Sequence, residues 1–202
     1  MAQRMGQVQG LVRASAGTFP LTARARRQAC AFDYLIILKH ATIIHTHQNT
    51  STMSAEEQQK KDEYYMQWAL KEAEAAYEEG EIPIGAIVVC RGRIIARAHN
   101  MTETLHDVTA HAEMQAITMA ADQLGGKYLS DCTLYVTVEP CPMCAGALGW
   151  SQIPRIVYGA PDIKRGYRTF APLVLHPKTK VTAGVLEDDC REIMQRFFKD
   201  KR

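Results

Sequence analysis

The spacing of apolar side chains predicts regular structure from residue 53 onward. Residues 56–79 have the helical period, and Gly80 ends that helix. Ser54 and Glu57 stand three residues apart at its start, which predicts an N-cap with a capping box. The residues expected to line its apolar face are Tyr65, Ala69, Ala73, Ala76 and Tyr77.

Five runs rich in β-branched and apolar residues predict a sheet. The first two lie on either side of Arg91-Gly92, so we expect them to form a hairpin. The gap before the last run is long enough for a crossover helix, which favours a parallel pairing of the last two strands. The strands are expected at residues 84–90, 93–99, 132–138, 155–159 and 180–185.

Three further helices are expected between and after these strands, at residues 110–124, 142–150 and 189–199. Pro142 stands in the first turn of one of them, where proline is tolerated. This order predicts an α/β fold, a three-layer α/β/α sandwich in which a five-stranded mixed sheet has helices on both faces. The expected inward residues of the 110–124 helix are Ala112, Ala116, Met119 and Ala120, and those of the last helix are Cys190, Ile193, Met194 and Phe197.

Residues 1–52 differ from the rest of the chain. They carry six Lys or Arg, a single acidic residue and no sustained period, so they cannot bury enough apolar surface to order themselves. We expect an N-terminal extension that is disordered or non-native, with residues 53–202 forming the folded domain. Two interpretations stay open: a transit peptide, which has this composition, or translation that starts at Met53. The histidines at 40, 45 and 47 are interpreted as incidental.

Composition narrows the class of protein further. No apolar run is long enough to span a bilayer, so we expect no membrane association. Without an export signal, the six cysteines are interpreted as reduced thiols or metal ligands. Residues 53–154 carry a net charge of −8 and residues 155–202 a net of +5, which suggests a local contact with a polyanion. Charge alone equally fits an ordinary solvated surface.

Two short motifs carry the candidate chemistry. His111-Ala112-Glu113 is separated by 26 residues from Pro140-Cys141-Pro142-Met143-Cys144, and each motif lies at a predicted helix start. A structural zinc site is closed by four protein ligands, whereas a catalytic site has three and keeps one position open. Helix N-termini also stabilise thiolates. Glu113 can therefore move protons beside a zinc ion held by His111, Cys141 and Cys144; a structural metal site or a chance motif is the alternative.

These motifs resemble those of the zinc-dependent nucleobase deaminases, whose fold is cytidine deaminase-like. The closer resemblance is to the bacterial tRNA-specific adenosine deaminases. It covers about residues 53–202, so it implies a deaminase domain over that range. The supporting residues are 81–86, Asn100, 109–113, 134–141, 157–160, Asp162, Lys164, Phe197 and Phe198.

The resemblance implies an activity and a set of roles. The activity is zinc-dependent hydrolysis of adenosine to inosine at the wobble position (34) of tRNA anticodons, by a cytoplasmic homodimer with one Zn²⁺ per subunit and no nucleotide cofactor. Glu113 would be the catalytic proton shuttle. The implied metal ligands are His111, Cys141 and Cys144, and the implied substrate-binding residues are Asn100, the backbone N–H of Ala112, Asp162, Lys164, Phe197 and Phe198.

The chain departs from the family pattern at two places. Val108 stands where the family has proline, and residues 165–170 read Arg-Gly-Tyr-Arg-Thr-Phe where the family has small residues. Arginines and aromatic side chains suit phosphate contact and base stacking, so the second change is compatible with RNA binding.

Two other functions are compatible with the same motifs. The same zinc site would serve a guanine, cytosine or nucleotide deaminase acting on a small molecule, although the basic C-terminal quarter favours RNA. The second alternative function is that of a non-catalytic RNA-binding module stabilised by zinc. Glu113 separates it from an enzyme, because a structural site has no use for a carboxylate beside an open coordination position.

Overall fold

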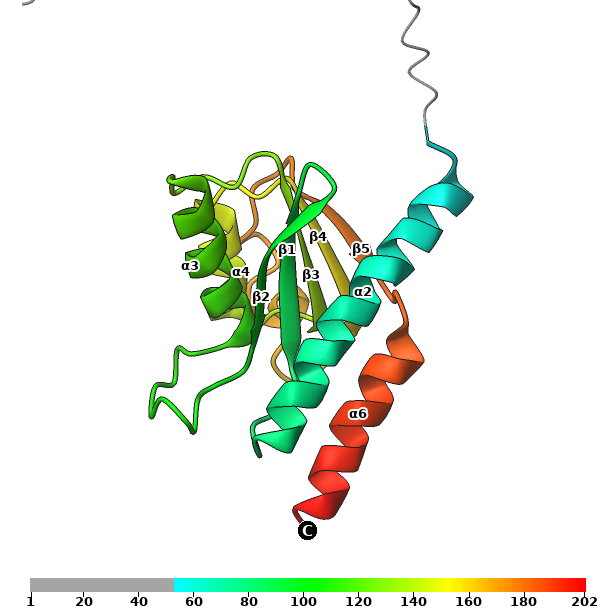
Figure 1. The fold of residues 1–202 in the computed structure, drawn as a ribbon, viewed down its shortest axis with the longest axis vertical. Helices are drawn as coiled ribbons and strands as arrows, with labels where there is room; N and C mark the ends of the chain where they lie inside the picture. The colour runs from blue at the N-terminus through cyan, green and yellow to red at the C-terminus, as the bar shows by residue number, and fades with distance from the viewer. Residues whose placement is uncertain (1–52) are drawn as a thin grey trace, which may run out of the picture. The chain divides into compact units, whose positions relative to one another are not determined.

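The computed structural model describes residues 53–202, which form a five-stranded sheet flanked by helices (Figure 1). The predictions made for residues 1–52 concern a part of the chain that lies outside the described residues. In chain order the elements are α2 (Ala55–Glu78), β1 (Gly85–Cys90), β2 (Arg93–His99), α3 (Ala112–Leu124), β3 (Cys132–Val138), α4 (Pro142–Trp150), β4 (Arg155–Ala160), α5 (Tyr167–Phe170), β5 (Lys180–Ala183) and α6 (Glu187–Asp200).

The sheet is mixed, as predicted. Its strand order is β2-β1-β3-β4-β5, with β1 antiparallel to both β2 and β3, and β4 parallel to both β3 and β5. The β1–β2 hairpin turns at Arg91 and Gly92, whose φ angles of 49° and 77° both lie in the left-handed region. A two-residue turn of this kind matches the twist of the strands that it joins.

Helices cover both faces of the sheet, which confirms the three-layer sandwich. Figure 1 shows α2 and α6 on one face and α3 and α4 on the other. Strand β1 is buried along its whole length and supplies both cores, because successive side chains point to opposite faces. Ala86 and Val88 pack in the core that contains Ala116, and Ile87 and Val89 in the core that contains Met66.

Local signals placed most helix ends correctly. The capping box at Ser54 and Glu57 is present at the start of α2. Helix α3 begins at Ala112, two residues later than expected. The prediction that Met119 faces inward was wrong, since 48% of this residue is exposed. Alanines at every fourth position bring α3 close to the sheet and leave the long Met119 side chain on its flank.

The carboxyl ends of β3 and β4 lie side by side, with Val138 paired to Ala160. Ligands commonly bind at this edge of a sheet, because the chain leaves parallel strands there in loops and helix starts. Helix α4 begins directly after β3, so its N-terminus lies at this edge. Among residues 53–202, no helix combines the length and the apolar character needed to cross a membrane.

Candidate deaminase active site

A cavity of about 890 Å³ opens at the carboxyl ends of β3 and β4. It is lined by the segment before β1, the start of α3, the end of β3, the loop after β4 and one side of α6. The polar and charged residues around it are His111, Glu113, Glu139, Cys141, Asp162, Lys164, Arg165, Arg191, Gln195, Lys199 and Arg202. The cavity therefore joins a buried reactive end to a charged rim.

Two helix starts bring the candidate metal ligands together. His111 is the N-cap of α3, Cys141 is the N-cap of α4, and Cys144 lies in the first turn of α4. The Nδ1 atom of His111 lies 3.7 Å from Sγ of Cys141 and 3.5 Å from Sγ of Cys144. Tetrahedral zinc with ordinary Zn–N and Zn–S bonds places such atoms about 3.6 Å apart. The donor atoms therefore fit one zinc ion, and no fourth His, Cys, Asp or Glu of the described residues joins the cluster.

The two thiols affect each other's ionisation. The pKa of Cys141 falls to about 4, because its thiolate accepts hydrogen bonds from Cys144 and His111. The pKa of Cys144 is raised by its hydrogen bond to Cys141 and by burial. The hydrogen bond to Cys141 also raises the pKa of His111. Two neighbouring thiolates repel each other, which disfavours ionisation of both cysteines. A divalent cation bound to Cys141 and Cys144 would offset this repulsion.

Glu113 is a buried carboxylate beside these donors. The residue is 3% exposed, and burial raises its pKa to about 7. Its Oε2 atom is buried and has no hydrogen-bond partner among the described residues. An unpaired buried carboxylate oxygen is costly, and a ligand that enters through the cavity would supply the missing partner.

A family model for the zinc-binding region of cytidine and deoxycytidylate deaminases matches residues 59–160. A tRNA-specific adenosine deaminase of Bacillus subtilis is 47% identical over 146 residues, which cover 70% of this chain and 91% of the relative. The chain belongs to the zinc-dependent cytidine and deoxycytidylate deaminase family. The family expectation is confirmed, and with it a zinc ion as the cofactor that the His/Cys/Cys donor set holds.

Solved structures agree with this placement. One comes from a study of A-to-I editing by tRNA:A34 deaminases; it is 45% identical with a TM-score of 0.61, and the match covers 64% of this chain and 98% of that chain. A guanine deaminase from Nitrosomonas europaea is 26% identical with a TM-score of 0.61, over 67% and 83% of the two chains. The deaminase thus shares its fold with enzymes named for different bases, so the fold by itself does not define its substrate.

Asn100 follows β2 and is held by a network that the sequence did not predict. The residue is 3% exposed, and its Nδ2 donates to Oε2 of Glu81 at 2.9 Å and to Oγ1 of Thr102 at 3.0 Å. Glu81 is fully buried and also accepts from the backbone N–H of Thr104 at 2.7 Å. Burial raises the pKa of Glu81, but the backbone N–H groups of Thr104 and Glu103 contribute to lowering it below its usual value.

The loop after β2 is closed by a backbone hydrogen bond that joins the residue after Asn100 to the residue before His111, although neither Asn100 nor Ala112 is among the residues that line the cavity. The N–H of Met101 donates to the carbonyl of Ala110 at 3.0 Å, and Ala110 immediately precedes His111. Ala112 is fully buried in the first turn of α3, where no side chain caps the helix. The first backbone N–H groups of a helix have no intrahelical partner, and that of Ala112 is one of them.

The other predicted substrate residues divide into those on the cavity and those away from it. Asp162, Lys164 and Phe198 line the cavity. Phe197 is instead buried, with its ring centroid 5.9 Å from that of Tyr77. Of the two phenylalanines, only Phe198, which is 47% exposed, offers a ring to a nucleotide. Met194, predicted to face the core, also lines the cavity.

Sequence reasoning missed the acidic residues that support the site. Glu81 and Glu139 belong to the segments that carry the family resemblance but were not predicted as site residues, yet both are buried and Glu139 lines the cavity. A signal was present, since each carboxylate adjoins a run of apolar residues that becomes buried. A charged residue is rarely buried without partners, so a partnered carboxylate was the expected outcome at both positions.

Proposed function

We propose that this chain catalyses the hydrolytic deamination of adenosine to inosine at the wobble position of tRNA anticodons, and that residues 53–202 are the catalytic domain. The observation that carries the proposal is the unpaired Oε2 of Glu113, which lies next to a three-donor zinc site at the end of a large cavity. The relatives at 44–47% identity are named tRNA-specific adenosine deaminases.

In this reaction a water oxygen forms a bond to C6 of adenine, and the bond from C6 to the exocyclic nitrogen breaks to release ammonia. Zinc, when bound by His111, Cys141 and Cys144, supplies a Lewis acid that lowers the pKa of water. Glu113 accepts the proton of that water, delivers it to the ring nitrogen N1, and then helps protonate the departing amine. Because the pocket is largely closed to solvent around Glu113, these protons stay with the reacting groups.

Two groups are proposed to hold the base. Asn100 presents a side-chain amide whose Nδ2 end is fixed by Glu81, and the backbone N–H of Ala112 is offered by the uncapped start of α3. Ala112 directly follows the zinc donor His111, and Asn100 is joined to the same segment through the bond from Met101 to Ala110. They would orient C6 toward the metal without taking part in bond cleavage.

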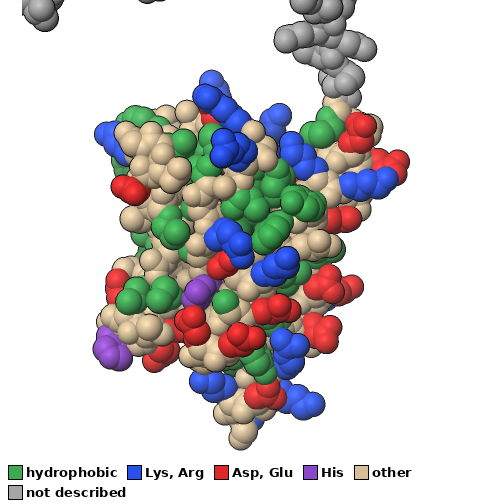
Figure 2. Space-filling model, viewed as in Figure 1, with side chains coloured by type: hydrophobic (Ala, Val, Ile, Leu, Met, Phe, Trp, Pro, Cys, Tyr) green, Lys and Arg blue, Asp and Glu red, His purple; other side chains and the backbone are tan. Residues whose placement is uncertain are grey.

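The charge distribution supports an RNA substrate. Helix α2 has more acidic than basic side chains, and Figure 2 shows the acidic groups over it interspersed with Lys and Arg. In contrast, Lys164, Arg165, Lys199 and Arg202 line the cavity, and Phe198, which is 47% exposed, lines it as well. Positive groups of this kind neutralise phosphates, and an exposed aromatic ring stacks on an unpaired base. A free base would need neither.

We also propose that the enzyme is a homodimer that acts in the cytoplasm, where anticodons are accessible. Large apolar side chains are exposed at the end of α4 and in the segment after α5: Trp150 is 86% exposed and Leu173 is 94% exposed. Exposed apolar patches on folded proteins commonly mark interfaces. Sedimentation equilibrium should give twice the monomer mass, and Trp150→Glu should shift the protein toward the monomer.

One assay separates the candidate functions. Purified protein is incubated with an anticodon stem–loop that carries adenosine at the wobble position, and separately with guanine and with cytidine, while inosine and ammonia are measured. We expect inosine from the RNA alone. Turnover restricted to guanine or cytidine would replace the RNA assignment with a small-molecule deaminase.

The Glu113→Gln variant tests whether the site is catalytic at all. It keeps the size of the side chain and removes the proton carrier, so turnover should fall by at least about 10²-fold while the zinc content stays at one ion per chain. A non-catalytic zinc module would show no turnover in either form. Full activity in Glu113→Gln would eliminate the proposed proton shuttle.

A further inference from the structure

The loop between β4 and α5, residues 161–166 (the β4–α5 loop), forms one wall of the cavity. It includes Lys164 and Arg165, which are both exposed and line the cavity. Asp162 shapes the loop from within, because its Oδ1 accepts from the backbone N–H groups of Lys164 at 2.9 Å and Arg165 at 3.0 Å. The loop therefore has a defined conformation that directs two cations to the cavity rim.

The carboxylate of Glu139 binds the backbone at the start of this loop and in α5, which follows the loop. The residue is 6% exposed and stands between the last residue of β3 and the ligand-bearing segment Pro140-Cys141. Its Oε2 accepts from the backbone N–H of Asp162 at 3.2 Å, and its Oε1 accepts from the backbone N–H of Arg168 at 3.0 Å. Both carboxylate oxygens are thus already engaged by the backbone.

Further bonds connect the same two segments. The N–H of Tyr167 donates to the carbonyl of Pro140 at 2.9 Å, and the N–H of Glu139 donates to the carbonyl of Ala160 at 2.8 Å. Arg168 also donates from its guanidinium to the hydroxyl of Tyr158 at 3.0 Å. The β4–α5 loop is consequently fastened to the strand end that continues into Cys141.

Gly166 shows how closely the loop approaches this carboxylate. A Cβ atom added at Gly166 would lie 2.5 Å from Oε1 of Glu139 and 2.4 Å from the carbonyl oxygen of Asp162. Both distances are far below van der Waals contact, so only glycine fits at this point. The position is selected by space and not by backbone angle, since the φ of Gly166 is −64°.

We propose that Glu139 is a positioning residue for the substrate: it fixes the β4–α5 loop so that Lys164 and Arg165 meet RNA phosphates at a set distance from the zinc donors. The inference rests on the proposed function, because it presumes an RNA substrate. Lys and Arg side chains are long and flexible, and their contribution to binding depends on a backbone that is already in place. Glu139 acts through the loop and does not move protons.

The first test compares Glu139→Ala and Glu139→Gln with the wild-type enzyme on the anticodon stem–loop at several salt concentrations. In Glu139→Ala, KM should rise roughly tenfold or more with a smaller change in kcat. The slope of log Kd against log salt should weaken by about 1.4, since each lost phosphate contact on a single strand contributes about 0.7. Glu139→Gln retains one acceptor oxygen and should lie between the two. Zinc content and thermal midpoint are measured alongside.

The second test approaches the same contact from the loop. Gly166→Ala should reproduce the KM and salt effects of Glu139→Ala, whereas the control Gly126→Ala should not, because an added Cβ at Gly126 meets no atom within 4 Å. The double variant should lose no more than the worse single variant, since both release the same loop. Multiplying losses would contradict a shared role.

The outcomes separate the two proposals. Absence of inosine formation by the wild-type enzyme defeats the proposed function. If the wild-type enzyme deaminates the RNA but Glu139→Ala keeps its KM and its salt slope, the positioning role is wrong and the function stands. Loss of zinc together with an equal fall in kcat would also overturn it, because Glu139 would then support the metal segment instead of the loop.

Discussion

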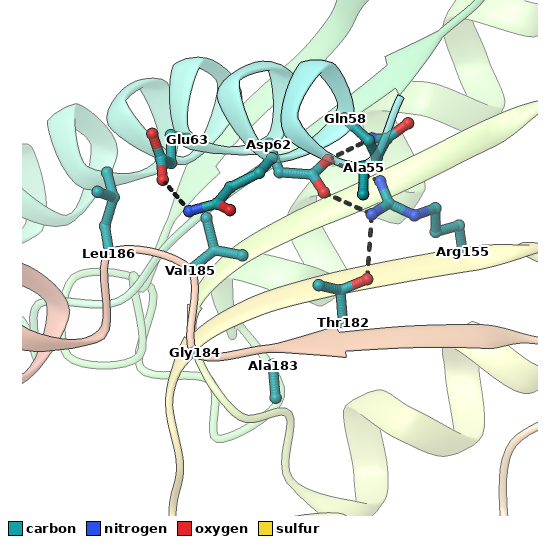
Figure 3. A pocket seen from close by; sticks show the side chains of 11 residues that line it. Ala55, Gln58, Asp62, Glu63, Arg155, Thr182, Ala183, Gly184, Val185 and Leu186 are labelled. Carbon is teal, nitrogen blue, oxygen red and sulfur yellow. Dashed lines mark hydrogen bonds and ion pairs between the residues drawn. The ribbon is translucent and has the colours of Figure 1, made fainter. Parts of the chain in front are cut away.

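The buried carboxylate of Asp62 allows a prediction about stability that is separate from activity. Asp62 is 2% exposed and lies on α2 beside a small cavity at the start of β4 (Figure 3). Its two oxygens accept from the guanidinium of Arg155 at 2.8 and 2.6 Å, and the Tyr135 hydroxyl donates to it at 2.9 Å. All these groups are paired with one another, so we interpret the cluster as structural.

Asp62→Asn removes the charge and leaves Arg155 without its counter-ion. Breaking a buried ion pair typically costs about 3–5 kcal/mol of unfolding free energy. The Arg155 side chain is 21% exposed and can regain some hydration, so we expect the lower end, about 3 kcal/mol. For a domain of this size, about 2–4 °C of melting temperature per kcal/mol gives a fall of roughly 6–12 °C.

The loss should depend on pH in a definite direction. Burial alone raises the pKa of Asp62, but the hydrogen bonds from Arg155 and Tyr135 and the charge of Arg155 together lower it below the ordinary value of 3.8. A group with a lowered pKa stabilises the fold fully above its unfolded-state value, and this contribution disappears as pH falls through the folded-state value. The difference between wild type and Asp62→Asn should therefore be largest near neutral pH and shrink below pH 3.8.

Thermal unfolding followed by circular dichroism at a series of pH values measures this difference. Glu56→Gln is the matched control, because the Glu56–Lys60 pair is exposed and should contribute less than about 1 kcal/mol. Deamination at 25 °C should be unchanged in both variants, since the cluster and the active site lie at opposite ends of β4. Equal midpoints at neutral pH, or a difference that grows on acidification, would refute the reasoning.

Three further outcomes are expected. Glu81→Gln should lower kcat/KM by roughly tenfold with zinc content unchanged, because the amide of Asn100 loses its fixed orientation. An unchanged kcat/KM in steady-state assays would exclude a role of Glu81 in orienting Asn100. Removal of zinc by a chelator should lower the melting temperature and make Cys141 react with a thiol reagent before Cys144 does. Mass spectrometry can locate the label, and equal labelling of both cysteines would contradict the expected order. Gly85→Ala should prevent stable folding, because the added Cβ would lie 2.1 Å from the carbonyl oxygen of Ala69, and a cooperative melt at the wild-type temperature would show that α2 can move away.

The sequence by itself determined the elements and the reactive donors. Strand and helix periods, the capping box at Ser54 and the Arg91-Gly92 turn are encoded within a few residues, so they can be recognised without knowledge of the fold. The His111 and Cys141 motifs were also recognisable, because each places its ligand at a helix start and the metal needs both. The mixed sheet followed from the lengths of the connections between strands.

Tertiary structure alone decided how the surroundings of those donors are arranged. Glu139 finds its hydrogen-bond partners at Asp162 and Arg168, which lie more than twenty residues further along the chain. Phe197 and Phe198 are adjacent and chemically identical, yet one is buried against Tyr77 and the other faces the cavity. Such outcomes depend on the packing of distant segments. Periodicity reports which side of an element is apolar, whereas the fold determines which neighbour meets each side chain and whether water reaches it.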